Sequence, residues 1–384
     1  MQLLVPTNWD PALISPLSEL EADVELYGVL PASMIGSGGS GPDGVRMTEK
    51  QAAEYIEQAH SAGLTFDYVL NAPSMGNMEW EENTHRELLR HLEWIESAEA
   101  DSVTVTIPYL IELIKRQFPR LSVRVSTIAH VNSVARAKWL ESLGAESITL
   151  DINANRDFVL LTAIREAVNC ELTVLVNNLC LYQCPYEYYH HDGLGHASQS
   201  CSAPGGCYVD YCVLRCTLDR LCDMSQTVKS RWVRPEDIHV YEEIGIDVFK
   251  TSGRSMSTDR ILSSAAAYSS RRYQGNLYDI LNVLTPKAGA TGSASLGVPG
   301  SAIGLPPKLH IDNQALEGFL DFFKTQDCLS ECNHCSYCRQ IADNVLRFER
   351  DEVARYIAVL GAHLENLSSS RMFETKAEIR KRLH

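Results

Sequence analysis

A short apolar run followed by an amphipathic helical segment recurs along the first 250 residues, and this repeat limits the possible folds more than any other feature. The runs are rich in β-branched residues, which predicts buried strands. Helical patterns over Met47 to Ala62 and Val131 to Leu143 are typical of crossovers between parallel strands. Eight parallel strands close a barrel, so we predict an α/β fold, a TIM-like (β/α)8 barrel. The predicted strands are Leu3 to Thr7, Val24 to Leu30, Phe66 to Asn71, Ser102 to Ile107, Val123 to Thr127, Ser147 to Asp151, Leu172 to Asn177 and Val248 to Thr251.

A doubly wound open sheet is the alternative fold. Its usual signature is a glycine fingerprint after the first strand, but here that strand runs into Pro6-Thr7-Asn8-Trp9. Polar residues follow most of the predicted strands, and a barrel would gather them at one mouth. They are Asn8, Asn71, Tyr109, Thr127 with His130, Asp151 with Asn153, Asn177 with Asn178, and Ser252 with Arg254.

The pattern changes after Leu284 and predicts three regions. The barrel occupies residues 1–285, and residues 286–308 are rich in Gly, Ser, Ala and Pro, which fits a linker or a lid. Residues 309–384 form a Cys-rich helical C-terminal extension. Within it we expect a short helix over Asn313 to Phe323 and one long helix from Arg339 towards Leu364.

Charge and hydropathy limit the partners and the compartment. The net charge of −15 disfavours a broad nucleic-acid surface. No stretch approaches the roughly 20 apolar residues of a membrane span, and the N-terminus lacks the features of a signal peptide, so we expect a cytoplasmic protein. In a reducing compartment, 12 cysteines favour metal binding or thiol chemistry over disulfides.

Seven cysteines fall between Leu179 and Asp223. Cys180 and Cys184 are four apart, as are Cys212 and Cys216, and on helical turns this spacing places each pair on one face. Four thiolates fit a 4Fe-4S cluster, a structural zinc or, with no metal, a set of core cysteines. We favour the cluster because zinc usually prefers C-x2-C spacing and because the first pair follows the seventh strand, at the mouth. Three further cysteines of the region could be spare thiols, alternative ligands or redox partners: Cys201, Cys207 and Cys222.

A second set, Cys328, Cys332, Cys335 and Cys338, lies in the extension. Its C-x3-C-x2-C portion matches the spacing of radical enzymes that bind S-adenosylmethionine, but in those enzymes the motif follows the first barrel strand. The position near the C-terminus instead favours a second iron-sulfur cluster or a zinc site.

Cations and histidines at the mouth are candidate catalytic residues. Lys250 and Arg254 follow the eighth strand and suit a carboxylate or phosphate substrate, unless they pair with the nearby acids Glu242, Glu243 or Asp247. His190, His191 and His196 lie between the cysteine pairs and could transfer protons.

Two further sequence patterns bear on function. The glycine-rich segment from Gly36 to Gly41 could bind an anion through its backbone amides, although a flexible loop is the simpler interpretation. Neither Gly-x-Ser-x-Gly nor His-Glu-x-x-His is present, so a peptidase mechanism has no recognisable residues.

Several motifs resemble one branch of the collagenase-like peptidase family U32 across nearly the whole chain. They are VYEEIGIDVFKTSGRSMSTDR, VNNLCLYQCPYEYYHHDGLGHASQ, DYCVLRC, IAHVNSVARAKWLESLGAESITLDINANRDF and NAPSMGN. The resemblance implies a TIM-like barrel and an iron-sulfur protein, and several similar proteins are oxygen-independent hydroxylases with prephenate as the oxygen donor. It also implies that Cys180, Cys184, Cys212 and Cys216 are cluster ligands and that Arg254 binds an anion.

The leading hypothesis is an iron-sulfur enzyme that carries out an oxygen-independent redox or hydroxylation reaction on a small anionic molecule. In it Arg254 and Lys250 hold a carboxylate, and His191 or His196 moves protons. An electron-donor protein or a homologous partner subunit is an expected partner. The alternatives are a non-catalytic iron-sulfur scaffold or electron carrier, a U32-type peptidase and an RNA-modifying hydroxylase.

Overall fold

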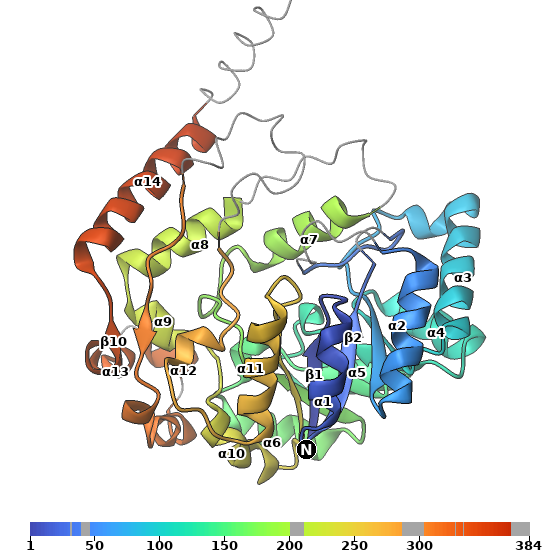
Figure 1. The fold of residues 1–384 in the computed structure, drawn as a ribbon, viewed down its shortest axis with the longest axis horizontal. Helices are drawn as coiled ribbons and strands as arrows, with labels where there is room; N and C mark the ends of the chain where they lie inside the picture. Colours follow the sequence, from blue (N-terminus) through green and yellow to red (C-terminus); the bar gives the residue numbers. More distant parts are fainter. Residues whose placement is uncertain are drawn as a thin grey trace, which may run out of the picture.

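The computed structural model has a closed barrel of eight parallel strands, which confirms the predicted fold class (Figure 1). It describes residues 1–30, 33–39, 47–199, 211–285, 303–326, 328–332 and 334–369. The strands pair in chain order, and β8 pairs with β1 to close the sheet. All eight predicted strands are present, with ends shifted by a few residues. They are β1 (Gln2–Pro6), β2 (Asp23–Gly28), β3 (Thr65–Leu70), β4 (Ser102–Val105), β5 (Ser122–Val125), β6 (Ser147–Thr149), β7 (Glu171–Leu175) and β8 (Val248–Lys250).

Helices surround the barrel as the crossovers between its strands (Figure 1). The connection from β7 to β8 is the longest and carries both predicted cysteine pairs of the barrel. The helices up to residue 269 are α1 (Ile14–Ser18), α2 (Glu49–Ser61), α3 (Glu82–Ser97), α4 (Pro108–Gln117), α5 (Val134–Ser142), α6 (Phe158–Ala167), α7 (Glu187–Ser198), α8 (Tyr211–Cys222), α9 (Ser225–Lys229), α10 (Ile238–Glu242) and α11 (Thr258–Ser269).

The local sequence explains where the two helices predicted in detail begin. Helix α2 starts with a capping box, because the Thr48 side chain accepts from the Gln51 amide and the Gln51 side chain accepts from the Thr48 amide. In α5 the Ser133 side chain accepts from the Arg136 amide. These caps set the N-termini two or three residues inside the predicted ranges.

The C-terminal extension packs beside α8 and α9 rather than standing apart (Figure 1). The long helix predicted over Arg339 to Leu364 is wrong, because two helices and a short strand occupy this range. Leu346 and Arg347 leave the helix to pair with Ile311 and His310. The elements are β9 (His310–Ile311), the 3-10 turns Gln314–Leu316 and Phe319–Lys324, α12 (Cys328–Glu331), α13 (Tyr337–Val345), β10 (Leu346–Arg347) and α14 (Arg350–Ser368).

Most of the predicted linker, residues 286–302, lies outside the described residues. The described end of that segment is not a free connection, because Ile303 is buried in a small apolar cluster with Leu214 of α8 and Leu360 of α14. The larger core is shared as well. Phe319 of the extension stacks on Trp232, a fully buried side chain in the β7–β8 connection.

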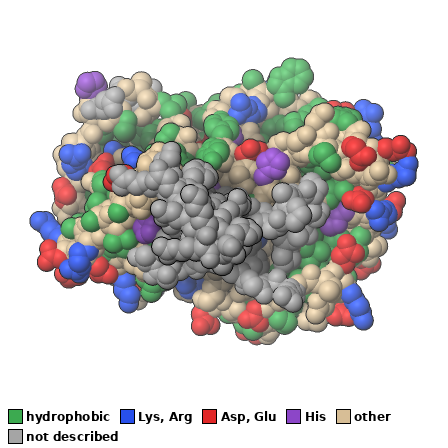
Figure 2. Space-filling view, turned by 90° about the horizontal axis from the view of Figure 1, so that it is seen from above, with side chains coloured by type: hydrophobic (Ala, Val, Ile, Leu, Met, Phe, Trp, Pro, Cys, Tyr) green, Lys and Arg blue, Asp and Glu red, His purple; other side chains and the backbone are tan. Residues whose placement is uncertain are grey.

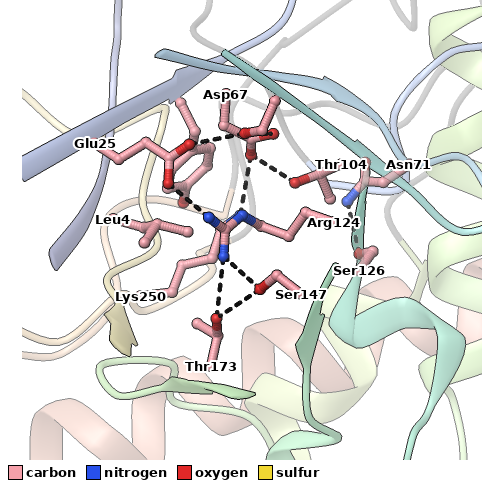
Figure 3. A network of polar contacts seen from close by, with 12 residues as sticks. Leu4, Glu25, Asp67, Asn71, Thr104, Arg124, Ser126, Ser147, Thr173 and Lys250 are labelled. Carbon is pink, nitrogen blue, oxygen red and sulfur yellow. Dashed lines mark hydrogen bonds and ion pairs between the residues drawn. The ribbon is translucent and has the colours of Figure 1, made fainter. Parts of the chain in front are cut away.

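Charged side chains fill the barrel interior (Figure 3). The Arg124 guanidinium lies 2.7 Å from Glu25 Oε2 and 2.6 Å from Glu171 Oε1. Ser102 Oγ lies 2.8 Å from Glu25 Oε1 and 3.1 Å from Asp67 Oδ1, so its proton links the two carboxylates. Burial raises the pKa of Glu25, and Arg124 opposes that rise. In the strand runs DVELYG, TFDYVL and SVRV, one charged residue lies between two apolar or aromatic neighbours: Glu25, Asp67 and Arg124. This pattern is the sequence signal from which the network could have been predicted.

No helix among the described residues has the length and apolar character that a membrane crossing requires.

Replacing Arg124 with Met should destabilise the protein by about 3–5 kcal/mol, because Glu25 would remain buried without its ion-pair partner. Urea unfolding at neutral pH measures the free energy. Arg120→Met is the control, since Arg120 pairs with Glu96 at the surface and its loss should change stability little. Equal stability of the two variants would contradict a compensating role for Arg124.

Candidate functional site at the barrel mouth

The loop after β2 is held against the carboxyl ends of the strands, a face we call the barrel mouth. Arg254 Nη2 donates to Ser37 Oγ at 2.8 Å and to Gly39 O at 3.0 Å. Asn71, at the end of β3, accepts from Ser37 Oγ and from the Gly38 amide. A Cβ on Gly39 would lie 2.8 Å from Arg254 Nη2, so a side chain there would displace the guanidinium. The structure thus brings the glycine-rich segment and Arg254 together.

The described amides of the glycine-rich segment do not form an anion cradle. Those of Gly36 and Ser37 donate to Ser33 Oγ and Ser198 Oγ, and that of Gly38 donates to Asn71. Because protein acceptors already take these protons, a ligand would have to displace them. Residues 40 and 41 of the segment lie outside the described residues.

Arg254 is the cation best placed for an anionic ligand. Its side chain is buried, and Nη1 has no hydrogen-bond partner among the described residues. Burial lowers the pKa of this guanidinium, while Tyr27 and Asp67 oppose the change. A buried guanidinium with one unsatisfied nitrogen can gain a strong charge-assisted hydrogen bond from a carboxylate.

Lys250 lies inside the barrel, against Asp67 and Tyr27. Its Nζ is 3.7 Å from Asp67 Oδ2 and 4.0 Å from the centroid of the Tyr27 ring (Figure 3). The acids considered from sequence, Glu242, Glu243 and Asp247, are not its ion-pair partner. Burial lowers the pKa of Lys250 to about 8, although Asp67 pulls it upward.

Among the candidate histidines, His191 is held in a defined orientation by the loop at the mouth. Its Nδ1 lies 2.6 Å from the Gly38 carbonyl oxygen, which can only accept, so Nδ1 carries the proton and Nε2 is left as a proton acceptor. Burial lowers the pKa of His191, which keeps the ring neutral. His190 stacks on His191, and burial lowers its pKa to about 4. His196 lies exposed in the last turn of α7.

The four predicted cluster cysteines come together beside the mouth. Electrostatic interactions link Cys180 to Cys184 and Cys216, and Cys184 to Cys212 and Cys216. Burial is the largest cause that raises the pKa of Cys180 and of Cys184, the latter to about 12. Asn178 Nδ2 donates to Cys180 Sγ at 3.2 Å, a contact that would also stabilise a thiolate.

The local structure of the first pair differs from the prediction. Cys212 and Cys216 lie one turn apart on α8, as expected, but Cys180 and Cys184 lie in a loop with a turn at Tyr182 and Gln183. Gln183 has a left-handed φ of 51°, and Pro185 follows Cys184, so the segment cannot continue as a helix. Of the three remaining cysteines, Cys222 ends α8 and is exposed, whereas Cys201 and Cys207 lie outside the described residues.

No three of the four described thiols Cys180, Cys184, Cys212 and Cys216 have their sulfurs within 4.8 Å of one another. Zinc binds thiolates at about 2.3 Å, which places the sulfurs of a tetrahedral site about 3.8 Å apart. A single zinc ion would therefore require the thiols to move closer together.

The second cysteine set also gathers, beside two buried arginines. Cys338 is electrostatically coupled to Cys328 and Cys335, and the Cys335 amide donates to the Cys332 carbonyl. Burial raises the pKa of Cys338, and Arg156 and Arg231 oppose that rise. Cys338 therefore lies within electrostatic range of two other cysteines of the set, and positive charge lies next to it.

Arg156 and Arg231 have no carboxylate within ion-pairing distance among the described residues. Arg156 donates to the carbonyls of Val228 and Trp232 and lies 4.7 Å from the Trp232 ring centroid. Arg231 lies 3.9 Å from the ring centroid of Tyr182, in the loop between Cys180 and Cys184. Burial lowers the pKa of Arg156 to about 9, and Arg231 adds to this effect.

A third group of ligand-type side chains lies at the ends of β5, β6 and β7. The ligand atoms of His130, Asp151 and Glu187 all lie within 4.8 Å of one another, the one such group among the described residues. Sequence analysis placed His130 and Asp151 at strand ends but missed Glu187. The strand-end rule does not reach Glu187, because it lies on the first turn of α7.

Figure 2, seen from above, shows the face that carries α7 and α8, where histidine, acidic and basic side chains lie around the region outside the described residues.

Comparisons with known proteins agree on one family. The family model described as peptidase family U32 matches residues 44–274. The chain is 31% identical over 299 residues to the uncharacterized protease MJ1657 of Methanocaldococcus jannaschii, covering 77% of this chain and 81% of the relative. The solved structure of the U32 peptidase Mk0906 has a TM-score of 0.50 and 22% identity, covering 66% of this chain and 92% of that one.

Asn71→Ala should release the loop at the mouth, because it removes the acceptor for the Ser37 hydroxyl and the Gly38 amide. Hydrogen–deuterium exchange of residues 36–39 should become at least tenfold faster, with little change in the barrel strands. Asn83→Ala on the exposed face of α3 is the control. Unchanged exchange in Asn71→Ala would show that the loop is held by other contacts.

Proposed function

Because the chain belongs to peptidase family U32, we propose that it is an iron-sulfur enzyme that carries out an oxygen-independent redox or hydroxylation reaction on a small anionic molecule. The observation that carries the proposal is the group of four cysteines that interact electrostatically beside the barrel mouth, where Arg254 also lies. The net charge of −15 favours a small substrate over RNA.

Cys180, Cys184, Cys212 and Cys216 would hold a 4Fe-4S cluster, which supplies electron transfer when bound. The chain's own contribution begins with Asn178, whose amide donates to Cys180 Sγ. Arg220 lies near the same thiol and opposes the rise in its pKa. Both contacts favour the thiolate form that a metal requires.

Arg254 would bind a carboxylate through Nη1 while Nη2 stays attached to the Ser37–Gly39 loop. His191 would accept or return a proton at Nε2, since Nδ1 is committed to the Gly38 carbonyl. Lys250 has no such part, because its charge compensates Asp67. His196 is exposed and is not needed for this arrangement.

The extension would hold a second metal centre at Cys328, Cys332, Cys335 and Cys338. Arg156 and Arg231 support this proposal, because both lie near Cys338 and neither has a described carboxylate partner. A metal–thiolate centre carries negative charge and would offset theirs. Either a second cluster or zinc is compatible with these side chains.

Anaerobic reconstitution should give roughly four irons and four sulfides per chain if one cluster forms, and roughly eight of each if both sets take clusters. Cys180→Ser should lose the mouth cluster while circular dichroism shows a folded chain. Cys222→Ser, on the same helix as Cys212 and Cys216 but exposed, should keep it.

A colourless, iron-free wild type after reconstitution would overturn the proposal. Global unfolding of Cys180→Ser would instead favour a structural cluster in a scaffold or electron carrier. A zinc assay of the wild type and of Cys338→Ser identifies the metal of the extension.

Arg254→Gln should weaken binding of prephenate, the proposed oxygen donor, by at least tenfold, because a charged hydrogen bond to a carboxylate is worth about 1.5–3 kcal/mol. Anaerobic titration calorimetry measures the affinity. Arg272→Gln removes the same charge from an exposed position away from the mouth and should leave the affinity unchanged. If the wild type does not bind prephenate, or if both variants bind it equally, the role given to Arg254 is wrong.

A further inference from the structure

His130, Asp151 and Glu187 converge on one point at the mouth. His130 Nδ1 lies 3.4 Å from Asp151 Oδ2 and 3.9 Å from Glu187 Oε1. The exposed fractions of the three side chains are 6%, 4% and 15%. The ligand atoms therefore face each other in a space largely removed from solvent.

Asn153 fixes the orientation of both carboxylates. Its side-chain amide donates to Asp151 Oδ1 at 3.0 Å and to Glu187 Oε2 at 3.4 Å, and its backbone amide donates to Asp151 Oδ1 at 2.8 Å. Each carboxylate thus has one oxygen held by Asn153 and turns the other towards His130. Metal sites commonly orient their ligands through such outer hydrogen bonds.

The imidazole turns Nδ1 towards this point. Asp151 Oδ2 faces Nδ1, whereas Nε2 is buried and has no hydrogen-bond partner among the described residues, so a metal ion would take the place of the proton on Nδ1. With the proton on Nε2, Nδ1 is an unprotonated donor atom. His130 also has a left-handed backbone, with φ 51° and ψ 52°.

No lysine or arginine compensates the two carboxylates within the part of the chain that the structure describes. Among the described residues neither Asp151 nor Glu187 forms an ion pair with a lysine or arginine, and His130 is their shared partner. Asn132 Nδ2 adds one long contact, 3.4 Å from Asp151 Oδ2. Two carboxylates at this depth repel each other unless a cation lies between them.

We propose that His130, Asp151 and Glu187 form a binding site for a single divalent transition-metal ion of the Mn²⁺, Fe²⁺ and Zn²⁺ class, separate from both cysteine sets. One imidazole and two carboxylates suit ions of intermediate hardness. Nitrogen and oxygen ligands about 2.0–2.2 Å from such an ion lie about 3.4 Å apart at tetrahedral angles. The distance of 3.4 Å between His130 Nδ1 and Asp151 Oδ2 already has this value. A small rotation of the Glu187 side chain would shorten the distance of 3.9 Å between His130 Nδ1 and Glu187 Oε1 to match it.

Three protein ligands leave coordination positions open for water or a substrate oxygen. The site is therefore an addition to the proposed function and does not depend on a cluster at the cysteines. Mn²⁺ binds carboxylates and imidazole in preference to thiolates, so Mn²⁺ binding measures this site separately from the cysteine sites.

Electron paramagnetic resonance of the full chain titrated with Mn²⁺ tests the proposal. We expect one saturable site per chain, with a nitrogen coupling from imidazole in the pulsed spectrum. Glu187→Gln and Asp151→Asn should each weaken binding at least tenfold, and His130→Ala should abolish the nitrogen coupling. Asp192→Asn, an exposed acid on the same helix as Glu187, should bind Mn²⁺ like the wild type.

Cys180→Ser should keep the Mn²⁺ site, whereas it should lose iron, so the two proposals fail independently. Glu187→Gln provides a second measurement because it removes one of two repelling carboxylates. It should unfold at the same or a higher temperature than the metal-free wild type, yet lose the stabilisation that Mn²⁺ gives the wild type. Absence of saturable Mn²⁺ binding by the wild type, absence of a nitrogen coupling, or equal binding by Glu187→Gln would overturn the metal site.

Discussion

Closure of the barrel around a charged interior is the constraint on which the mouth depends. Pairing of β1 with β8 leaves no free edge, and the inward side chains must then compensate one another without water. Arg124 forms ion pairs with Glu25 and Glu171. Lys250 lies against Asp67 (Figure 3). Because the charge of Lys250 compensates that of Asp67 inside the barrel, Arg254 is the cation that contacts the loop at the mouth.

The barrel could be predicted from the sequence because its signals are local. Apolar runs and capping residues such as Thr48 act within a few positions, and the Cys212–Cys216 spacing identifies one helix face. The failures come from contacts distant in sequence. Lys250 has three acids nearby in the chain, yet its partner is Asp67, which the barrel brings across from β3. The helix predicted over Arg339 to Leu364 breaks because Leu346 pairs with Ile311, and a tertiary contact of this kind leaves no periodic signal.

Asn153 links two of the three candidate sites. Its side-chain oxygen accepts from the Gln183 amide, in the turn between Cys180 and Cys184, while its side-chain nitrogen orients Asp151 and Glu187. The position of the first cysteine pair and the orientation of the carboxylates are therefore set by the same side chain. The sequence places Asn153 at a strand end. Its two contacts also require the loops after β6 and β7 to be adjacent, and this adjacency comes from the order of the strands in the barrel.

The buried arginines explain why the extension packs against the barrel as part of one core. Arg156 comes from the β6–α6 region, and its guanidinium lies against Trp232 of the barrel and against Phe319 and Phe323 of the extension. Carbonyls and aromatic faces stabilise a guanidinium but do not neutralise it, and a second cation, Arg231, lies close by. Asp237 is within electrostatic range of Arg156, and Cys338 is the thiol that interacts electrostatically with both arginines. A metal–thiolate centre there would complete the charge balance between the barrel and its extension, so its loss should loosen their interface as well as remove the metal.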